Sequence, residues 1–155
     1  MGRLATPDEG QHTITVRMAD VGDAADVASL LEALGYPCTR SEAADRILVA
    51  TGDSRQQLLL AERDGHVRGL VSLHSLYMFA NGADLARITA LVVEPGEHRQ
   101  GIGRRLLREA EALARRTGAA RIEVTSGPQR TEARAFYCSC GYSGDSQRFV
   151  KLLGD

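Results

Sequence analysis

Residues 91–107 constrain the fold of this chain more than any other stretch, and they read LVVEPGEHRQGIGRRLL. The run from 87 to 93 is mostly apolar and β-branched, and Pro95 ends it, as expected of a buried strand. After Gly101, apolar residues recur at helical spacing, at Ile102, Leu106, Ala110 and Leu113. The pattern predicts a buried strand, a short loop and a helix with glycines at its start.

The start of that helix is suited to binding phosphate. The first backbone N–H groups of a helix have no partner within it, and the helix dipole adds partial positive charge there. Gly101 and Gly103 carry no Cβ atom that would keep phosphate oxygens away. Full charge is available nearby from Arg99, Arg104 and Arg105. A simpler alternative stays open, in which the glycines only turn the chain or let the helix pack closely on a strand.

Two familiar nucleotide-binding motifs are excluded. The phosphate loop Gly-x-x-x-x-Gly-Lys-Ser/Thr needs a lysine, and the one lysine of this chain is Lys151. The dinucleotide motif Gly-x-Gly-x-x-Gly needs a third glycine, but Leu106 stands three residues after Gly103. The remaining reading is a pyrophosphate site that uses neither motif.

This segment resembles the acyl-coenzyme A signature of the GNAT superfamily of N-acetyltransferases, Arg/Gln-x-x-Gly-x-Gly/Ala after a strand that ends in Val-x-Pro. Residues 133–142, ARAFYCSCGY, resemble the second signature of that family, Ala-x-x-Phe-Tyr-x-x-x-Gly-Tyr/Phe, which lies on the helix beside the thioester. Together with a matching order of strands and helices, the resemblance covers residues 14–153. It implies that acetyl-coenzyme A is the acetyl donor.

The chain departs from the family pattern at two positions. His98 stands where the first signature has Arg or Gln, with Arg99 one place late, and Arg130 stands where many members have an asparagine that contacts the cofactor. The run 130–137, with 148–152 after it, is similar to small-amine members such as the aminoalkylphosphonate N-acetyltransferases.

The resemblance implies a set of contacts to acetyl-coenzyme A. The strand before the loop splays from the strand at 121–125, so that the backbone of Leu91 and Val93 pairs with the pantetheine arm. A backbone N–H near Val93 polarises the thioester carbonyl. The full set of expected cofactor-binding residues is Leu91, Val92, Val93, His98, Arg99, Gln100, Gly101, Ile102, Gly103, Arg104, Arg130, Ala133 and Phe136.

The resemblance also gives Tyr137 the role of the general acid that protonates the coenzyme A thiolate, since a phenol can donate a proton at neutral pH. The alternative is a tyrosine that only packs against Phe136. The general base is either His74, whose ordinary pKa near 6.5 suits the task, or Glu94. His74 also fits a hydrogen-bonded core residue. Two further carboxylates that would attract a cationic amine, or simply be solvated, are Glu32 and Asp84.

Length and composition agree with one enzyme domain. The 155 residues are enough for a single core, which we expect at 13–155 after a loose tail at 1–12. A net charge of −1 and no apolar run near ~20 residues argue against nucleic-acid and membrane partners. Three cysteines and no signal peptide indicate the cytoplasm, and no zinc-ligand pattern is present, so we expect no metal. The sequence leaves a homodimer open.

The predicted fold is α/β, with a mixed, mostly antiparallel central sheet, flanking helices and one splayed strand pair. The expected strands are 14–18, 57–62, 67–79, 87–93, 121–125 and 148–153, and the expected helices are 20–34, 41–49, 101–117 and 132–138. The predicted function is transfer of an acetyl group from acetyl-coenzyme A to a primary amine of a small molecule by direct attack. The alternatives are an acyl-coenzyme A-binding regulatory module without catalysis and a protein N-acetyltransferase.

Overall fold

The computed structural model describes residues 13–97, 101–125, 131–144 and 148–154. Contacts between residues divide the chain into two compact units, Met1–Thr125 and Ser126–Asp155. The expectation of a single domain over 13–155 therefore stays a prediction.

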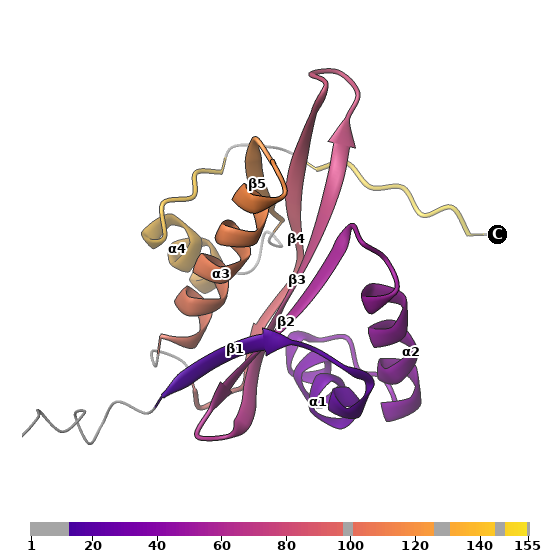
Figure 1. Cartoon of the computed structure of the whole chain (residues 1–155), viewed down its shortest axis with the longest axis vertical. Helices are drawn as coiled ribbons and strands as arrows, with labels where there is room; N and C mark the ends of the chain where they lie inside the picture. Colours follow the sequence, from indigo (N-terminus) through magenta and orange to yellow (C-terminus); the bar gives the residue numbers. More distant parts are fainter. Residues whose placement is uncertain (1–12, 98–100, 126–130, 145–147, 155) are drawn as a thin grey trace, which may run out of the picture. The chain divides into compact units, whose positions relative to one another are not determined.

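The first unit is built on a five-stranded sheet in which the strands lie in chain order (Figure 1). All neighbours are antiparallel except the last two strands, which are parallel. This confirms the predicted mixed, mostly antiparallel sheet. The elements of the unit are β1 (Ile14–Met18), the 3₁₀ helix η1 (Val21–Asp23), α1 (Ala24–Leu34), α2 (Arg40–Thr51), β2 (Gln56–Arg63), β3 (His66–Met78), β4 (Ala83–Val93), α3 (Ile102–Arg116) and β5 (Arg121–Val124).

The β2–β3 hairpin forms where the sequence predicts it. Asp64 and Gly65 make the turn, and both have positive φ, 55° and 80°. Two-residue turns of this kind match the right-handed twist of paired strands, which is why an Asp-Gly pair between two apolar runs predicts a hairpin. The hairpin matters for the site because Arg63 and Arg68, which lie beside its turn, contact the residues that follow β4.

Helices cover both faces of this sheet (Figure 1). On one face α1 and α2 form a buried cluster with the strands, which includes Leu30, Ile47, Leu60, Leu70 and Val92. On the other face α3 packs closely over Gly69, where an added Cβ atom would lie 3.0 Å from both Ile102 Cγ2 and Leu106 Cδ1. The missing side chain of Gly69 thus makes room for the first turn of α3 against β3.

The starts of the first two helices differ in detail from the prediction. The expected helix at 20–34 is split into η1 and α1. The second helix begins at Arg40 rather than Ser41, because Thr39 is its cap: Thr39 Oγ1 accepts from Glu42 N at 3.0 Å, and Glu42 Oε1 accepts from Thr39 N at 2.9 Å. Ser41 stands one residue from Glu42, which is too close for this reciprocal arrangement.

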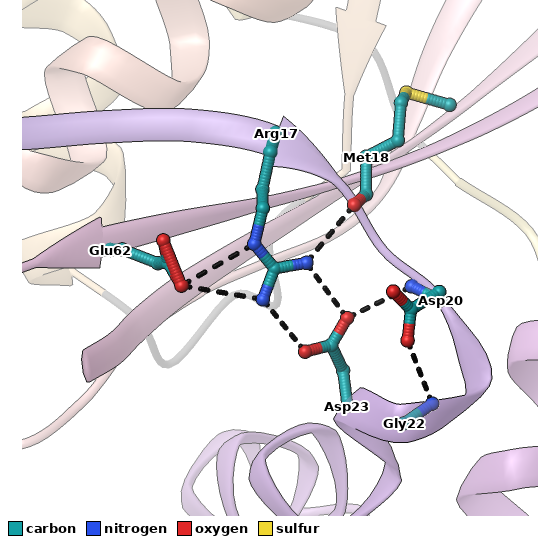
Figure 2. Close-up of polar contacts among 6 residues, drawn as sticks. All are labelled: Arg17, Met18, Asp20, Gly22, Asp23 and Glu62. Carbon is teal, nitrogen blue, oxygen red and sulfur yellow. Dashed lines mark hydrogen bonds and ion pairs between the residues drawn. The ribbon is translucent and has the colours of Figure 1, made fainter. Parts of the chain in front are cut away.

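An arginine on β1 ties the sheet to the first helical turn (Figure 2). The guanidinium of Arg17 donates to both carboxylate oxygens of Asp23, at 2.9 and 2.8 Å, and also contacts Glu62 on β2. The Asp23 carboxylate in turn accepts from the backbone N–H of Asp20 at 2.9 Å. The hydrogen bond from Arg17 is the main reason why the pKa of Asp23 is lowered, while burial acts in the opposite direction.

The second unit contains one helix, α4 (Thr131–Ser139), in its described residues. The expected strand at 148–153 is wrong, because residues 148–154 form neither a strand nor a helix. The apolar side chains of Phe149, Leu152 and Leu153 are about nine-tenths exposed. A mostly apolar run becomes a strand only when its backbone pairs with a neighbour, and the run by itself does not supply that partner.

Candidate functional site

The edge of β4 opens partway along the strand. β4 and β5 pair only from Leu85 with Arg121 to Ile88 with Val124, where β5 ends. β4 continues to Val93, so residues 89–93 have no partner strand on this edge in the described part of the chain. An unpaired edge offers backbone N–H and C=O groups to a ligand that lies alongside as a further strand. The predicted splayed pair is therefore present.

A β-bulge marks the point where the two strands separate. Ser72 pairs with Ala90 and Leu73 pairs with Ile88, which leaves Thr89 as an extra residue in β4. The hydroxyl of Thr89 lies 2.9 Å from Ser72 Oγ across the strands. Because a bulge bends its strand and increases the local twist, it helps to carry the rest of β4 away from the line of β5.

The turn that leaves β4 is held by two arginines from the β2–β3 hairpin. Glu94 N donates to Arg68 O at 2.7 Å, and the Arg68 side chain forms an ion pair with the Glu94 carboxylate. Glu97 N closes the turn onto Glu94 O at 3.0 Å, and the Glu97 carboxylate pairs with Arg63 and lies 3.7 Å from Arg68. The hydrogen bond to Glu94 is the main reason why the pKa of Arg68 is raised. This clasp, Arg63, Arg68, Glu94 and Glu97, fixes the turn that directly follows β4.

The first turn of α3 has the geometry expected of a phosphate site. Gly101 caps the helix with φ at +83° and no side-chain hydrogen bond, and a Cβ atom built on it would meet nothing within 4 Å. The first helical bond runs from Arg105 N to Gly101 O at 3.0 Å, so the N–H groups at positions 102–104 precede it. Ile102 is 1% exposed and anchors this turn on the sheet.

The arginines and other polar residues around the start of α3 fall into three groups. Arg105 is tied away from the helix start, to Glu109 at 3.1 Å and to Ile14 O at 3.3 Å. Arg104 is exposed at the first turn. Three of the predicted cofactor contacts, at His98, Arg99 and Gln100, lie outside the described residues. The structure thus supports a site made of backbone groups and leaves its side-chain partners as predictions.

The two candidates for the general base lie far apart along the β3–β4 pair, Glu94 beyond one end and His74 near the middle. Glu94 is at the clasp, beside Arg68, whereas His74 is six residues further along β3, about 20 Å away at ~3.3 Å per residue. His74 pairs with Arg87 on β4, one residue before the last β4–β5 pair, and is half-buried rather than a core residue. The carboxylate of Glu94 is already engaged by Arg68. Proximity to the strand separation favours His74.

The strand register brings together two charged residues that the sequence did not single out. Arg87 pairs with Glu123 on β5, and their side chains form an ion pair at 3.2 Å. Neither residue belongs to a recognisable motif, and the register that aligns them with His74 is a property of the folded sheet. Of the other two candidate carboxylates, Glu32 is exposed on α1 and Asp84 lies 3.9 Å from Arg55.

The residues of the second predicted signature lie on α4. Tyr137 packs against Phe136 and Tyr142, with ring centroids 5.5 and 5.9 Å apart. Tyr142 N donates to Tyr137 O at 3.0 Å as the helix ends at Gly141 with φ at +93°. The position of Ala133 is one turn before Tyr137, and Arg130 lies outside the described residues. The catalytic role of Tyr137 stays a prediction.

The described residues contain no group of three or more His, Cys, Asp or Glu side chains arranged to hold a metal ion. None of their helices has both the length and the apolar character needed to cross a membrane.

Comparison with known proteins identifies the family. The family model described as "Acetyltransferase (GNAT) family" matches residues 26–142, which include β4, the start of α3 and α4. This chain belongs to that family. The fold and both signature regions are thus those of a GNAT acetyltransferase domain.

Individual relatives agree with this assignment. An aminoalkylphosphonate N-acetyltransferase of Salmonella typhimurium is 38% identical over 94 residues, which span 61% of each chain. A GNAT family acetyltransferase of Staphylococcus aureus is 25% identical with a TM-score of 0.78, covering 90% of this chain and 98% of that one. A glucosamine-6-phosphate N-acetyltransferase of Arabidopsis thaliana, at 18% identity, shares the fold with a TM-score of 0.78 over 92% of this chain and 99% of that one.

Proposed function

We propose that this protein transfers the acetyl group of acetyl-coenzyme A to a primary amine of a small molecule. The observation that carries the proposal is the presence, in one unit, of the unpaired edge of β4 at 89–93 and the open start of α3 at Gly101. The two features differ in chemistry, since the strand edge suits an amide-containing arm and the helix start suits a pyrophosphate. Membership of the GNAT family supports the same ligand.

The strand edge and the helix start bind different parts of the ligand. The backbone N–H groups at 102–104 bind the pyrophosphate, and the edge of β4 pairs with the pantetheine arm. The thioester lies further from the helix start than the pyrophosphate does, so it reaches toward the bulge at Thr89. A backbone N–H between Thr89 and Val93 then polarises the thioester carbonyl, and the donor nearest the bulge is better placed than Val93 itself.

Proton transfer completes the reaction. His74 accepts the proton that the attacking amine loses, directly or through water, as the new C–N bond forms. Tyr137 donates a proton to the thiolate sulfur as the C–S bond breaks. Cys38 packs beside the α1–α2 core and Cys138 lies exposed on α4, and neither stands in a nucleophile setting, so the transfer is direct. Loss of a positioned acid costs ~10²–10⁴-fold in rate, so Tyr137→Phe should lower kcat by that order, whereas Cys138→Ala should be near neutral.

The acceptor is best sought among small amines. The relative named as an aminoalkylphosphonate N-acetyltransferase makes aminoalkylphosphonates the first compounds to test. Amino acids, polyamines and aminoglycosides complete a panel of primary amines with different charge, and a peptide with a free N-terminus represents a protein substrate.

The experiment measures release of free thiol from acetyl-coenzyme A with each acceptor, and calorimetry measures binding of acetyl-coenzyme A itself. Thiol release with at least one small amine is the expected result. Tight binding with no thiol release from any acceptor would instead favour a regulatory acyl-coenzyme A-binding module. Release with the peptide alone would favour a protein N-acetyltransferase.

A further inference from the structure

Three ionisable side chains form a row across β3, β4 and β5. His74 is directly paired with Arg87 in the antiparallel register, and Arg87 is directly paired with Glu123 in the parallel register. Directly paired residues project from the same face of a sheet. Because Leu70, four residues before His74 on β3, lies in the α1–α2 cluster, the row is on the face that those helices cover further along the strand.

The row lies at the point where β4 and β5 separate. Arg87 and Glu123 precede by one residue the last pair of the two strands, Ile88 with Val124. A ligand that lies along the free edge of β4 therefore has its tip beside this row. The side chains of Arg87 and Glu123 are 42% and 33% exposed, so a small molecule can reach them.

We propose that Arg87 and Glu123 together recognise the acceptor, and that the acceptor is a small zwitterion, with an ammonium group and an acidic group on a short chain. This inference rests on the proposed function. The substrate ammonium binds the Glu123 carboxylate, and the substrate acid, a phosphonate or a carboxylate, binds the Arg87 guanidinium. Arg87 suits this task because its planar N–H groups can engage two oxygens of an acid at once.

The ion pairs of Glu123 make such an exchange feasible. Glu123 contacts Arg87 at 3.2 Å and Arg121, on its own strand, at 2.9 Å. When Arg87 turns to a substrate acid, Glu123 keeps Arg121, so no carboxylate is left without a cation. Both partners are partly exposed, and a partly exposed ion pair contributes little and is easily exchanged.

The balance of charge at the row argues for a zwitterion over a polycation. Glu123 is flanked by two arginines, and the side chain beside Arg87 on β3 is a histidine rather than a carboxylate. A polyamine or an aminoglycoside brings several positive charges and would need an excess of carboxylates. A molecule with one charge of each sign matches an arginine and a glutamate side by side.

The test compares two acceptors of equal length, 2-aminoethylphosphonate and propylamine, with wild type and Arg87→Gln. We expect Arg87→Gln to lower the ratio of kcat/KM for the phosphonate to kcat/KM for propylamine by about 10- to 100-fold, the range for a lost charge-assisted contact. Arg87→Lys should recover part of the loss. The matched control is Arg40→Gln, which removes an exposed guanidinium at the start of α2 and should leave the ratio between the two acceptors as in wild type.

Other outcomes overturn the inference. An equal loss for both acceptors in Arg87→Gln would mean that Arg87 supports the sheet. The same change of the ratio in Arg40→Gln would mean a general effect of charge. Glu123→Gln should lower kcat/KM for both acceptors. If it affects neither, Glu123 does not bind the substrate ammonium.

Calorimetry separates this inference from the proposed function. Binding of 2-aminoethylphosphonate to the coenzyme A complex is measured in wild type and in Arg87→Gln. If wild type acetylates no amine but binds the phosphonate in an Arg87-dependent way, the proposed function fails and the recognition pair stands. If there is neither turnover nor binding, both are wrong.

Discussion

Two points along β4, its end near α3 and its middle where β5 separates from it, use the same side chains, arginine and glutamate, in opposite ways. At the end near α3, Glu94 is held by a backbone hydrogen bond and an ion pair to Arg68, and Glu97 is shared between two arginines. At the strand separation, Arg87 and Glu123 are joined by one ion pair and both are partly exposed. An ion pair that is locked by backbone bonds positions the chain, whereas one without such bonds can exchange its partners for a ligand.

This difference predicts that the clasp and the row affect two separate properties, binding of acetyl-coenzyme A and choice of acceptor. Changes at the clasp should alter binding of acetyl-coenzyme A and leave acceptor choice alone. Changes at the row should do the reverse. Mutations that fail to separate in this way would break the comparison.

The largest effect is expected at the start of α3, which the clasp leads into. Gly101→Asn keeps a residue that tolerates positive φ but adds a side chain where the pyrophosphate binds. Several charge-assisted hydrogen bonds would be lost, so affinity for acetyl-coenzyme A should fall by about 100-fold or more. Calorimetry measures the affinity, and thermal unfolding reports the fold.

A matched control lies at the other end of the same helix. Gly118 also has φ at +83° with nothing within 4 Å of an added Cβ atom. Gly118→Asn should have the same small effect on thermal unfolding and none on affinity. Equal affinities for the two variants would show that the pyrophosphate does not bind at the start of α3.

The second effect concerns the contact that seats α3 on β3. In Gly69→Ala the new methyl group would lie 3.0 Å from Ile102 Cγ2 and Leu106 Cδ1 and 3.1 Å from Val92 O. Overpacking of this kind costs about 1–3 kcal/mol, and the first turn of α3 must shift to accommodate it. We expect a lower midpoint in denaturant unfolding together with weaker acetyl-coenzyme A binding. Gly144→Ala, with open space around the added atom, is the control, and an unchanged midpoint in Gly69→Ala would show that the contact relaxes freely.

The third effect tests the clasp itself. Arg68→Gln leaves two carboxylates near the phosphate site with one guanidinium between them, so affinity for acetyl-coenzyme A should fall by about tenfold. Adding Glu94→Gln removes the uncompensated charge and should recover most of the affinity. The acceptor preference should stay that of wild type in both variants.

The single variant Glu94→Gln tests whether Glu94 anchors the turn or acts as the general base. If Glu94 only anchors the turn, the single variant keeps kcat at saturating acetyl-coenzyme A. A large fall of kcat with unchanged affinity would instead make Glu94 the base and remove His74 from that role.

The sequence predicted those features that depend on neighbouring residues. Asp64 and Gly65 specify a hairpin by their own backbone preferences, and Gly101 marks a helix start that needs positive φ. The cap of α2 was missed by two residues, although the signal was there, because Thr39 has a glutamate three residues later and Ser41 does not.

Features that depend on distant parts of the chain were not predictable in the same way. The pairing of Arg87 with Glu123 arises from the register of two strands that α3 separates in sequence. A shift of one residue would send Arg87 to the opposite face, so alternation alone does not place it. Residues 148–153 show the converse, since the mostly apolar run FVKLL at 149–153 predicts a strand but forms none without a partner.

The smallest effect comes from a third set of ion pairs, which joins β1 and β2 to the first helical turn. Asp23→Asn removes the charge that Arg17 contacts, and because Arg17 is 37% exposed we expect a loss of only about 1 kcal/mol in the free energy of unfolding.

The folded-state pKa of Asp23 lies below its ordinary value of 3.8. The stabilisation is therefore fully present above that value and is lost as the pH falls through the lower, folded-state pKa. Urea unfolding of wild type and Asp23→Asn between pH 7 and pH 3 should show a constant difference down to about pH 4 and a shrinking one below it. Acetyl-coenzyme A affinity and acceptor preference should be unchanged at pH 7, since this set of ion pairs includes neither the clasp nor the Arg87–Glu123 pair. A difference that grows toward acid would mean that the Asp23 carboxylate destabilises the fold, contrary to its contacts with Arg17.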